Sequence, residues 1–188
     1  MRIGALLLAA GLSTRFGDTK LLATLHNGST VFAQTYDRLS AAIEDVVVIT
    51  RPELANALKL HGTQIQIFAN AHEGIGATLA FGIQFATHWD ACFVCLGDMP
   101  FVSTATYSRL LESADPNLIV VPEYNGTRGN PVVFGGRHFN SLTKLRGDSG
   151  GKLILAERSN HLRLIQVADP AVLMDIDTPE DLATLQTP

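Results

Sequence analysis

A glycine- and cation-bearing segment near the N-terminus is the strongest chemical signal in the sequence. It reads Leu8-Ala-Ala-Gly-Leu-Ser-Thr-Arg-Phe-Gly-Asp-Thr-Lys-Leu-Leu22 and follows the apolar run Ile3–Leu8. Small residues let backbone N–H groups close on a phosphate chain, to which basic side chains add positive charge. Loops between a strand and a helix usually have two to six residues, and this one has about twelve, which predicts a triphosphate-binding loop. The predicted nucleotide contacts are Leu8, Ala9, Ala10, Gly11, Ser13, Arg15 and Lys20.

Three aspartates at or just after the ends of predicted strands form a second set. Asp98 comes directly after the buried run Cys92–Leu96, and ligands of open α/β sheets lie beyond the carboxyl ends of the strands. A carboxylate there suits a hard cation such as Mg²⁺ that also binds phosphate oxygens. Taken alone, Asp98 is explained equally well as a helix-entry residue. Asp175 and Asp177 alternate onto one face of an extended segment. One of them is expected to join Asp98 on the metal, and Asp177 is favoured because it lies beside the predicted helix start.

Two further glycine-rich segments are candidates for ligand contact. Glu73–Leu79 lies between a predicted strand and a predicted helix, where bare backbone can contact a nucleobase edge; a plain turn is an equally good interpretation. Leu145–Lys152 combines flexible backbone with two basic residues around a helix start, where an acceptor phosphate is favoured; the alternative is a capped surface turn. The candidate residues are Gly74, Gly76 and Thr78 in the first segment and Asp148, Ser149 and Gly150 in the second.

The elements that must position these residues alternate along the chain, as is typical of βα units. Strands are predicted at Ile3–Leu8, Val46–Ile49, Gln64–Phe68, Cys92–Leu96, Asn117–Val121, Pro131–Phe134, Leu162–Gln166 and Val172–Asp175. Helices are predicted at Thr30–Ala42, Pro52–Leu60, Ala77–Thr87, Ser103–Ser113, Gly136–Leu142, Gly151–Glu157 and Pro179–Gln186. The turn signal Tyr124-Asn-Gly126 predicts antiparallel elements in the second half. The predicted fold is one Rossmann-like α/β domain over residues 1–188, with a mostly parallel sheet, helices on both faces and an antiparallel C-terminal addition.

Composition excludes several classes of protein. Of the 188 residues, 46% are hydrophobic and 17% are charged, which is typical of a globular chain. The net charge of −4 gives the surface as a whole no attraction for nucleic acid or anionic membrane. Cys92 and Cys95 lie three apart in a predicted buried strand and so face opposite sides, which argues against a redox or zinc pair. The run Ile3–Ala10 is too short to span a bilayer and lacks a cleavage pattern, which predicts a cytoplasmic protein.

Taken in order, these segments resemble the MobA-like nucleotidyltransferases, and most closely their molybdenum cofactor cytidylyltransferase branch. The first loop is similar to the family pattern L-A-A-G-x-S-x-R-x-G-x-x-K-x-L. Ala10 stands where the guanylyltransferase branch usually has a second glycine, which favours the cytidylyl branch. Two segments depart from the pattern: Gly74-Ile-Gly-Ala-Thr78 replaces G-M-S-x-S, and Asp98-Met-Pro100 replaces D-Q-P. Further matches are Leu96–Pro100, Gly126–Phe134, Gly147–Gly150 and Asp175–Asp181.

The resemblance implies a reaction and a set of site residues. The reaction is the Mg²⁺-dependent transfer of a nucleoside monophosphate from an NTP to a small phosphorylated acceptor, with release of pyrophosphate. CTP is favoured over GTP, molybdopterin cofactor is the expected acceptor, and a molybdoenzyme or its chaperone is a candidate protein partner. The implied metal ligands are Asp98 and Asp177. The implied catalytic residues are Arg15, Lys20 and Asp98, and the acceptor-binding residues are Arg128, Asn130, Asp148, Ser149 and Gly150.

Other functions fit the same scaffold, because a fold does not determine its chemistry. A guanylyltransferase is the alternative within the family. A nicotinamide-dependent oxidoreductase is disfavoured by the absence of G-x-G-x-x-G and of a ribose-binding acid after the second strand. A non-catalytic protein that delivers a cofactor would keep the first loop, but it has little need of both Asp98 and Asp177.

Overall fold

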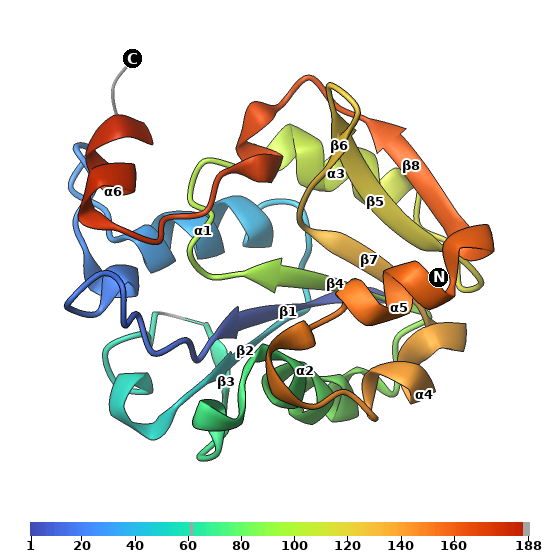
Figure 1. Ribbon diagram of the computed structural model, residues 1–188, viewed down its shortest axis with the longest axis horizontal. Helices are drawn as coiled ribbons and strands as arrows, with labels where there is room; N and C mark the ends of the chain where they lie inside the picture. The colour runs from blue at the N-terminus through green and yellow to red at the C-terminus, as the bar shows by residue number, and fades with distance from the viewer. Residues whose placement is uncertain (61, 186–188) are drawn as a thin grey trace.

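A parallel sheet at the centre of the molecule brings the glycine-rich loop and Asp98 to the same edge. The structure is a computed structural model that describes residues 1–60 and 62–185. Four strands run in parallel in the order β3-β2-β1-β4 (Figure 1): β1 (Ile3–Ala9), β2 (Val46–Thr50), β3 (Gln64–Ile67) and β4 (Ala91–Leu96). Leu8 of β1 pairs with Leu96 of β4. The loops that follow β1 and β4 therefore leave the sheet side by side.

The second half of the chain extends this sheet and includes the antiparallel elements that the sequence predicts. The added strands are β5 (Ile119–Tyr124), β6 (Thr127–Arg128), β7 (Val132–Gly135) and β8 (Leu162–Gln166). β7 lies between β4 and β5 and is antiparallel to both, whereas β8 is parallel to β5. The β5–β6 hairpin turns at Asn125 (φ 47°) and Gly126 (φ 79°). Two consecutive positive φ angles are typical of the tight hairpin turns that Asn-Gly favours.

Helices cover both faces of the sheet and complete three layers (Figure 1). Side chains from α1 (Val31–Ser40) and α3 (Thr104–Glu112) pack in one apolar cluster, and the partly buried leucines of α6 (Pro179–Leu185) join it. Side chains from α2 (Ile75–Gly82), α4 (Phe139–Leu142) and α5 (Lys152–Glu157) pack in the cluster on the other face. Alternate residues of the central strands supply both clusters, as the period of a strand requires. The predicted fold class is confirmed.

The two cysteines of β4 confirm this alternation. Cys92 packs in the cluster that contains α2, whereas Cys95 packs in the cluster that contains α1. Both thiols are free and buried, and burial raises the pKa of each. Buried, protonated thiols on opposite faces of a sheet form neither a disulfide nor a zinc site with each other.

Two predicted elements are wrong. The predicted strand Val172–Asp175 is instead a 3-10 turn, Pro170–Leu173, because Pro170 starts the turn and the Asp169 carboxylate accepts a hydrogen bond from the Ala171 amide. The predicted helix Pro52–Leu60 forms only the 3-10 turn Pro52–Leu54, followed by irregular turns. Helices in proteins depend on burying an apolar face, and in this segment only Leu54 and Leu58 are buried.

Other helical segments differ from prediction mainly at their ends. The predicted helix Ala77–Thr87 begins earlier, as α2, and continues as a 3-10 turn, and the predicted helix Gly136–Leu142 begins with a 3-10 turn before α4. Gln186, the predicted end of the last helix, lies outside the described residues. The remaining 3-10 turns are Lys20–Leu22, Ala71–Glu73, Ile83–Ala86, Gly136–His138, Gly147–Ser149 and Ser159–His161.

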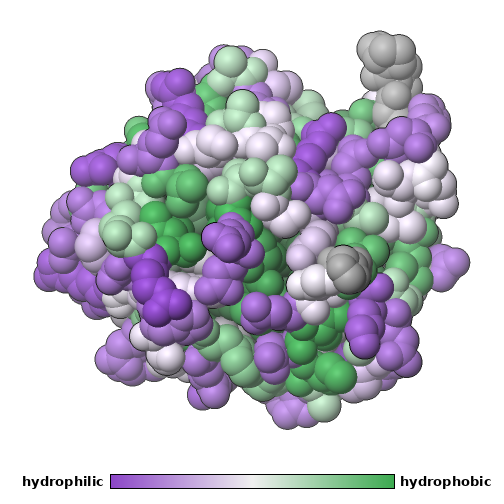
Figure 2. Space-filling view, turned by 180° about the vertical axis from the view of Figure 1, so that it is seen from behind, coloured by the Kyte–Doolittle hydropathy of each residue, from purple (hydrophilic) through white to green (hydrophobic). Residues whose placement is uncertain are grey.

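The surface is mixed in character. Hydrophilic residues divide the apolar surface on the face that Figure 2 shows. Such mixing is normal, because polar residues are too few to cover a folded chain completely. Within residues 1–60 and 62–185, no helix has both the length and the apolar character that crossing a membrane requires.

Candidate active site

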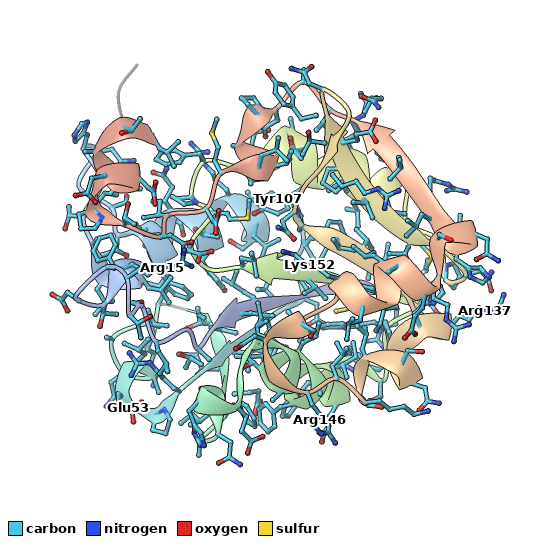
Figure 3. All side chains as sticks on the ribbon, viewed as in Figure 1. Arg15, Glu53, Tyr107, Arg137, Arg146 and Lys152 are labelled. Carbon is cyan, nitrogen blue, oxygen red and sulfur yellow. The ribbon has the colours of Figure 1, made fainter. Side chains whose placement is uncertain are left out.

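Four charged side chains from distant parts of the chain meet at the carboxyl edge of the sheet. Lys20 Nζ lies 2.6 Å from Asp98 Oδ2 and 2.8 Å from Asp177 Oδ1. Arg15 Nη2 lies 2.7 Å from Asp177 Oδ2, and Figure 3 shows Arg15 beside the segment that precedes α6. The side chains of Lys20, Asp98 and Asp177 are only 11%, 17% and 24% exposed, whereas that of Arg15 is 72% exposed. The two aspartates therefore share one ammonium group that is largely removed from water.

Local structure explains how the C-terminal aspartates reach Asp98. Ile176 is fully buried, and its amide donates to the backbone carbonyl of Asp98 (3.0 Å). Side chains alternate along an extended segment, so Asp175 and Asp177 point away from the core that holds Ile176. The α6 helix then begins with a reciprocal side-chain cap, because the Asp181 amide donates to Thr178 Oγ1 and the Thr178 amide donates to Asp181 Oδ2. The position of Asp177 is thus held from both sides.

Electrostatics in the cluster depend on this mutual pairing. Burial raises the pKa of Asp98, and the neighbouring Asp175 carboxylate raises it further, while Lys20 acts in the opposite direction. Burial by itself would lower the pKa of Lys20, but the Asp98 and Asp177 carboxylates outweigh that effect and raise it. Lys20 therefore remains positively charged throughout the neutral pH range.

The cluster has the donor set that a divalent cation needs. One ligand oxygen each from Asp98, Asp175 and Asp177 lies within 4.8 Å of the other two. Asp98 Oδ1 is buried and has no hydrogen-bond partner among the described residues. An unpaired buried acceptor is unfavourable unless a ligand satisfies it, and Mg²⁺ and Mn²⁺ prefer oxygen ligands. The residues present fit a divalent metal ion.

A cavity of about 470 Å³ opens beside this cluster, and we call it the loop cavity because the segment after β1 forms most of one wall. Ser13 stands out in that wall. It has a φ of 53°, in the left-handed region that disfavours residues with a side chain, and its buried Oγ has no hydrogen-bond partner among the described residues. Strain and an unpaired hydroxyl at one position indicate a ligand-binding role.

A second cavity, of about 390 Å³, adjoins the loop cavity on the side of the β5–β6 hairpin, and we call it the hairpin cavity. Its polar lining includes Arg128 and Asn130 near the hairpin and Ser149 and Lys152 near α5, and its floor is apolar. The residues common to both cavities are Leu8, Ile75, Leu96, Asp148 and Asp175.

One of the glycines predicted to contact the nucleotide has a packing role instead. Gly74 lines the loop cavity, but Gly76 lines neither cavity. A Cβ on Gly76 would lie 2.7 Å from the Gly147 carbonyl oxygen and 2.8 Å from that of Arg146, so this glycine allows α2 to pack against the backbone of another loop. Arg146 points away from both cavities (Figure 3), since its guanidinium donates to the carbonyls of Thr143 and Leu145.

The two cavities gather almost all of the predicted site residues. Those that line the loop cavity are Leu8, Ala9, Ala10, Gly11, Ser13, Arg15, Lys20, Gly74, Thr78, Asp98 and Asp177. Those that line the hairpin cavity are Arg128, Asn130, Asp148, Ser149 and Gly150. The sequence prediction missed His72, which lines the loop cavity, because a single histidine without metal-ligand spacing gives no signal in the sequence. It left open whether Asp175 or Asp177 joins Asp98, whereas the structure places both beside it.

Comparison with known proteins identifies the family. The model of the MobA-like NTP transferase domain matches residues 5–163, which is most of the chain. The chain belongs to this family. As a MobA-like protein it has the α/β nucleotidyltransferase fold, and the predicted family resemblance is confirmed.

Curated relatives of this MobA-like chain have diverse names. The purine catabolism protein PucB of Bacillus subtilis is 28% identical, over 93% of this chain and 91% of its own. The nicotine blue oxidoreductase of Paenarthrobacter nicotinovorans is 26% identical, over 97% of this chain and 96% of its own. The molybdenum cofactor cytidylyltransferase of Escherichia coli is 20% identical, over 97% and 94%.

Solved structures match this MobA-like chain along nearly its whole length. Rv0371c from Mycobacterium tuberculosis is 28% identical with a TM-score of 0.87, covering 99% of this chain and 97% of that one. A structure of Rv0371c in complex with manganese is 27% identical with a TM-score of 0.82, covering 99% and 98%.

Proposed function

We propose that this nucleotidyltransferase moves a nucleoside monophosphate from an NTP to a small phosphorylated acceptor and uses Mg²⁺. One observation carries the proposal: the Lys20 ammonium forms ion pairs with both Asp98 and Asp177, while Asp98 Oδ1 has no hydrogen-bond partner among the described residues. A non-catalytic binding protein has little need of buried carboxylates beside a cavity, because burying charge is costly.

The loop cavity is the proposed NTP site. The backbone from Ala9 to Ser13 lines it, and the bare backbone there suits the phosphate chain. Arg15 and Lys20 are the cations at its acidic end, and they neutralise the departing pyrophosphate. Gly74 and Thr78, at the start of α2, also line the cavity, and the base is expected beside them.

The hairpin cavity is the proposed acceptor site. Arg128 and Lys152 line it and suit an acceptor phosphate, while the apolar floor suits a ring system such as that of molybdopterin cofactor. An oxygen of that phosphate attacks the α-phosphorus of the NTP. The bond from the α-phosphorus to the oxygen that bridges to the β-phosphate breaks, and pyrophosphate leaves. Holding both substrates across the shared wall lowers the entropic part of the barrier.

A divalent ion fits beside this shared wall, with Asp98 as one ligand and Asp177 or Asp175 as a second. The ion would act as a Lewis acid and template for phosphate oxygens. Lys20 and Arg15 each pair with one oxygen of the Asp177 carboxylate and so favour its present orientation. The manganese complex of Rv0371c supports a divalent ion in a relative.

A thermal-unfolding panel of NTPs tests the nucleotide assignment. With Mg²⁺ present, CTP is expected to raise the unfolding temperature more than GTP, ATP or UTP, because Ala10 resembles the cytidylyl pattern. A ligand at a hundred times its dissociation constant adds about 2.7 kcal/mol of stability, which is readily measured. A larger shift with GTP would favour the guanylyltransferase alternative. No shift with any NTP would contradict the proposed function.

Replacing Ser13 with glycine is expected to stabilise the protein and weaken NTP binding. Left-handed backbone at a non-glycine residue costs about 1–2 kcal/mol, while glycine adds about 0.5–1 kcal/mol of unfolded-state entropy, so the free energy of unfolding should rise by about 0.5 kcal/mol. Loss of the hydroxyl should weaken NTP binding by about tenfold, since a hydrogen bond to a charged group contributes about 1.5–3 kcal/mol. Urea unfolding and nucleotide titration measure the two effects.

The Ser13→Ala variant is the control for this experiment. It removes the hydroxyl, as Ser13→Gly does, but keeps the left-handed backbone, so it should weaken NTP binding equally, and the difference in free energy of unfolding between the two variants reports the backbone strain alone. Unchanged NTP affinity in both variants would show that Ser13 Oγ does not contact the nucleotide.

A second candidate function rests on the relative that is named nicotine blue oxidoreductase. A nicotinamide dinucleotide also carries a pyrophosphate, which the loop cavity would accept on the same backbone. NADPH oxidation in the presence of candidate dye substrates, without release of pyrophosphate from any NTP, would favour the oxidoreductase.

A further inference from the structure

The three carboxylates of the cluster differ in which of their oxygens are already paired. Both oxygens of Asp177 are taken, one by Lys20 and one by Arg15. Asp98 Oδ2 is taken by Lys20, and Asp98 Oδ1 is buried without a hydrogen-bond partner. Asp175 makes no ion pair with any residue that the structure describes. Asp98 Oδ1 and the Asp175 carboxylate are therefore the open oxygens of the cluster.

The three carboxylates also differ in the cavity that they face. Asp98 and Asp177 line only the loop cavity, whereas Asp175 lines the loop cavity and the hairpin cavity. Asp175 is the most exposed of the three, so its side chain is the least constrained by packing. The buried Ile176 between the two C-terminal aspartates holds this segment against the backbone of Asp98.

The charges around each carboxylate also distinguish Asp175 from Asp177. Asp177 lies between two cations and offers a divalent ion little net negative charge unless both move away. One carboxylate oxygen of Asp175 lies within 4.8 Å of one of Asp98, and the two carboxylates would repel each other without a cation between them. Hard cations are held by such pairs of carboxylate oxygens.

We propose that Asp175, together with Asp98 Oδ1, binds the divalent ion from the acceptor side, and that Asp177 instead positions Lys20 and Arg15. This inference rests on the proposed function and refines it, since the family resemblance implies Asp177 as the second ligand. The ion then lies at the wall shared by the two cavities. Asp175 becomes a metal ligand that faces the acceptor, and Asp177 becomes a positioning residue for the two cations of the NTP site.

Binding of Mn²⁺ alone to the full chain tests this division without any turnover. Asp175→Asn and Asp177→Asn each remove one negative charge from the same cluster, so their common electrostatic effect cancels when the two are compared. Mn²⁺ affinity is measured from the free-ion signal in electron paramagnetic resonance, with urea unfolding to show that each variant is folded. Glu180→Gln, which removes an exposed carboxylate in the first turn of α6, is the control for charge outside the cluster.

Asp175→Asn is expected to weaken Mn²⁺ binding at least tenfold more than Asp177→Asn, and Asp98→Asn should resemble Asp175→Asn. Equal losses in the Asp175 and Asp177 variants, or a larger loss in the Asp177 variant, would overturn the inference. Such a result would leave the proposed function intact provided that the wild type still binds an NTP in the thermal-unfolding panel. A wild type that binds neither Mn²⁺ nor an NTP would overturn both.

Discussion

Replacing Asp98 with asparagine should lower the rate of pyrophosphate release by about three powers of ten, which corresponds to about 4 kcal/mol of transition-state stabilisation. Asp98 is the most buried carboxylate of the cluster and carries the unpaired oxygen that a metal ion would satisfy. Asparagine has nearly the same shape but lacks the negative charge that holds the ion. Pyrophosphate release with CTP or GTP, Mg²⁺ and molybdopterin cofactor measures the effect.

A matched control for this experiment lies at the other end of the same strand. Asp90 precedes β4, and its carboxylate accepts a hydrogen bond from the backbone amide of Arg2, far from both cavities. Asp90→Asn should leave the rate of pyrophosphate release within about twofold of the wild type. Near-normal release by Asp98→Asn would show that this carboxylate does not hold a metal ion during the reaction.

Replacing Lys20 with methionine should destabilise the ligand-free protein and abolish most of its activity. The change leaves the carboxylates of Asp98 and Asp177 close together without their shared ammonium group. Removing one partner of a buried ion pair costs about 3–5 kcal/mol, and the residual exposure of Asp177 lowers our expectation to about 3 kcal/mol. Urea unfolding at neutral pH, where Lys20 is charged, measures this loss of free energy of unfolding.

Magnesium should partly reverse the loss of stability in this variant. A cation that binds only the folded state stabilises it, and the uncompensated carboxylates of Lys20→Met should bind Mg²⁺ more tightly than those of the wild type. Lys59→Met, which removes an exposed lysine, is the control and should change the free energy of unfolding by less than about 0.5 kcal/mol. A similarly small change in Lys20→Met would mean that the ammonium contributes little to the fold.

Much of the fold is predictable from local patterns. The apolar runs that became β1, β2 and β4 are buried on both faces, so their sequence has a strong strand signal. The hairpin after β5 follows from Asn125 and Gly126, whose conformational preferences are local. The errors occur where the local signal is weak. In Val172–Asp175, the backbone makes isolated hydrogen bonds to other loops; for example, the Val172 carbonyl accepts from the Asn130 amide. This segment pairs with no strand among the described residues.

The candidate site also has features that the sequence predicts and features that it does not. The loop after β1 and the aspartates are visible in the sequence because their residue types suit phosphate and metal chemistry. The roles of Gly76 and Asp175 were not visible. Gly76 is required by the approach of the Gly147 carbonyl. Asp175 is distinguished from Asp177 by its lack of a cation, its greater exposure and its place on the wall of two cavities.

Sequence alone predicted the class of fold and the family, and it proposed residues that could bind a nucleotide and a metal, because each of these predictions depends on residue type and on spacing along the chain. Tertiary structure alone decided which carboxylates pair with Lys20 and Arg15 and which oxygen remains free. Those outcomes depend on distances between residues that are far apart in the chain. A difference of a few ångströms decides whether a carboxylate is neutralised by a lysine or is open to a metal ion.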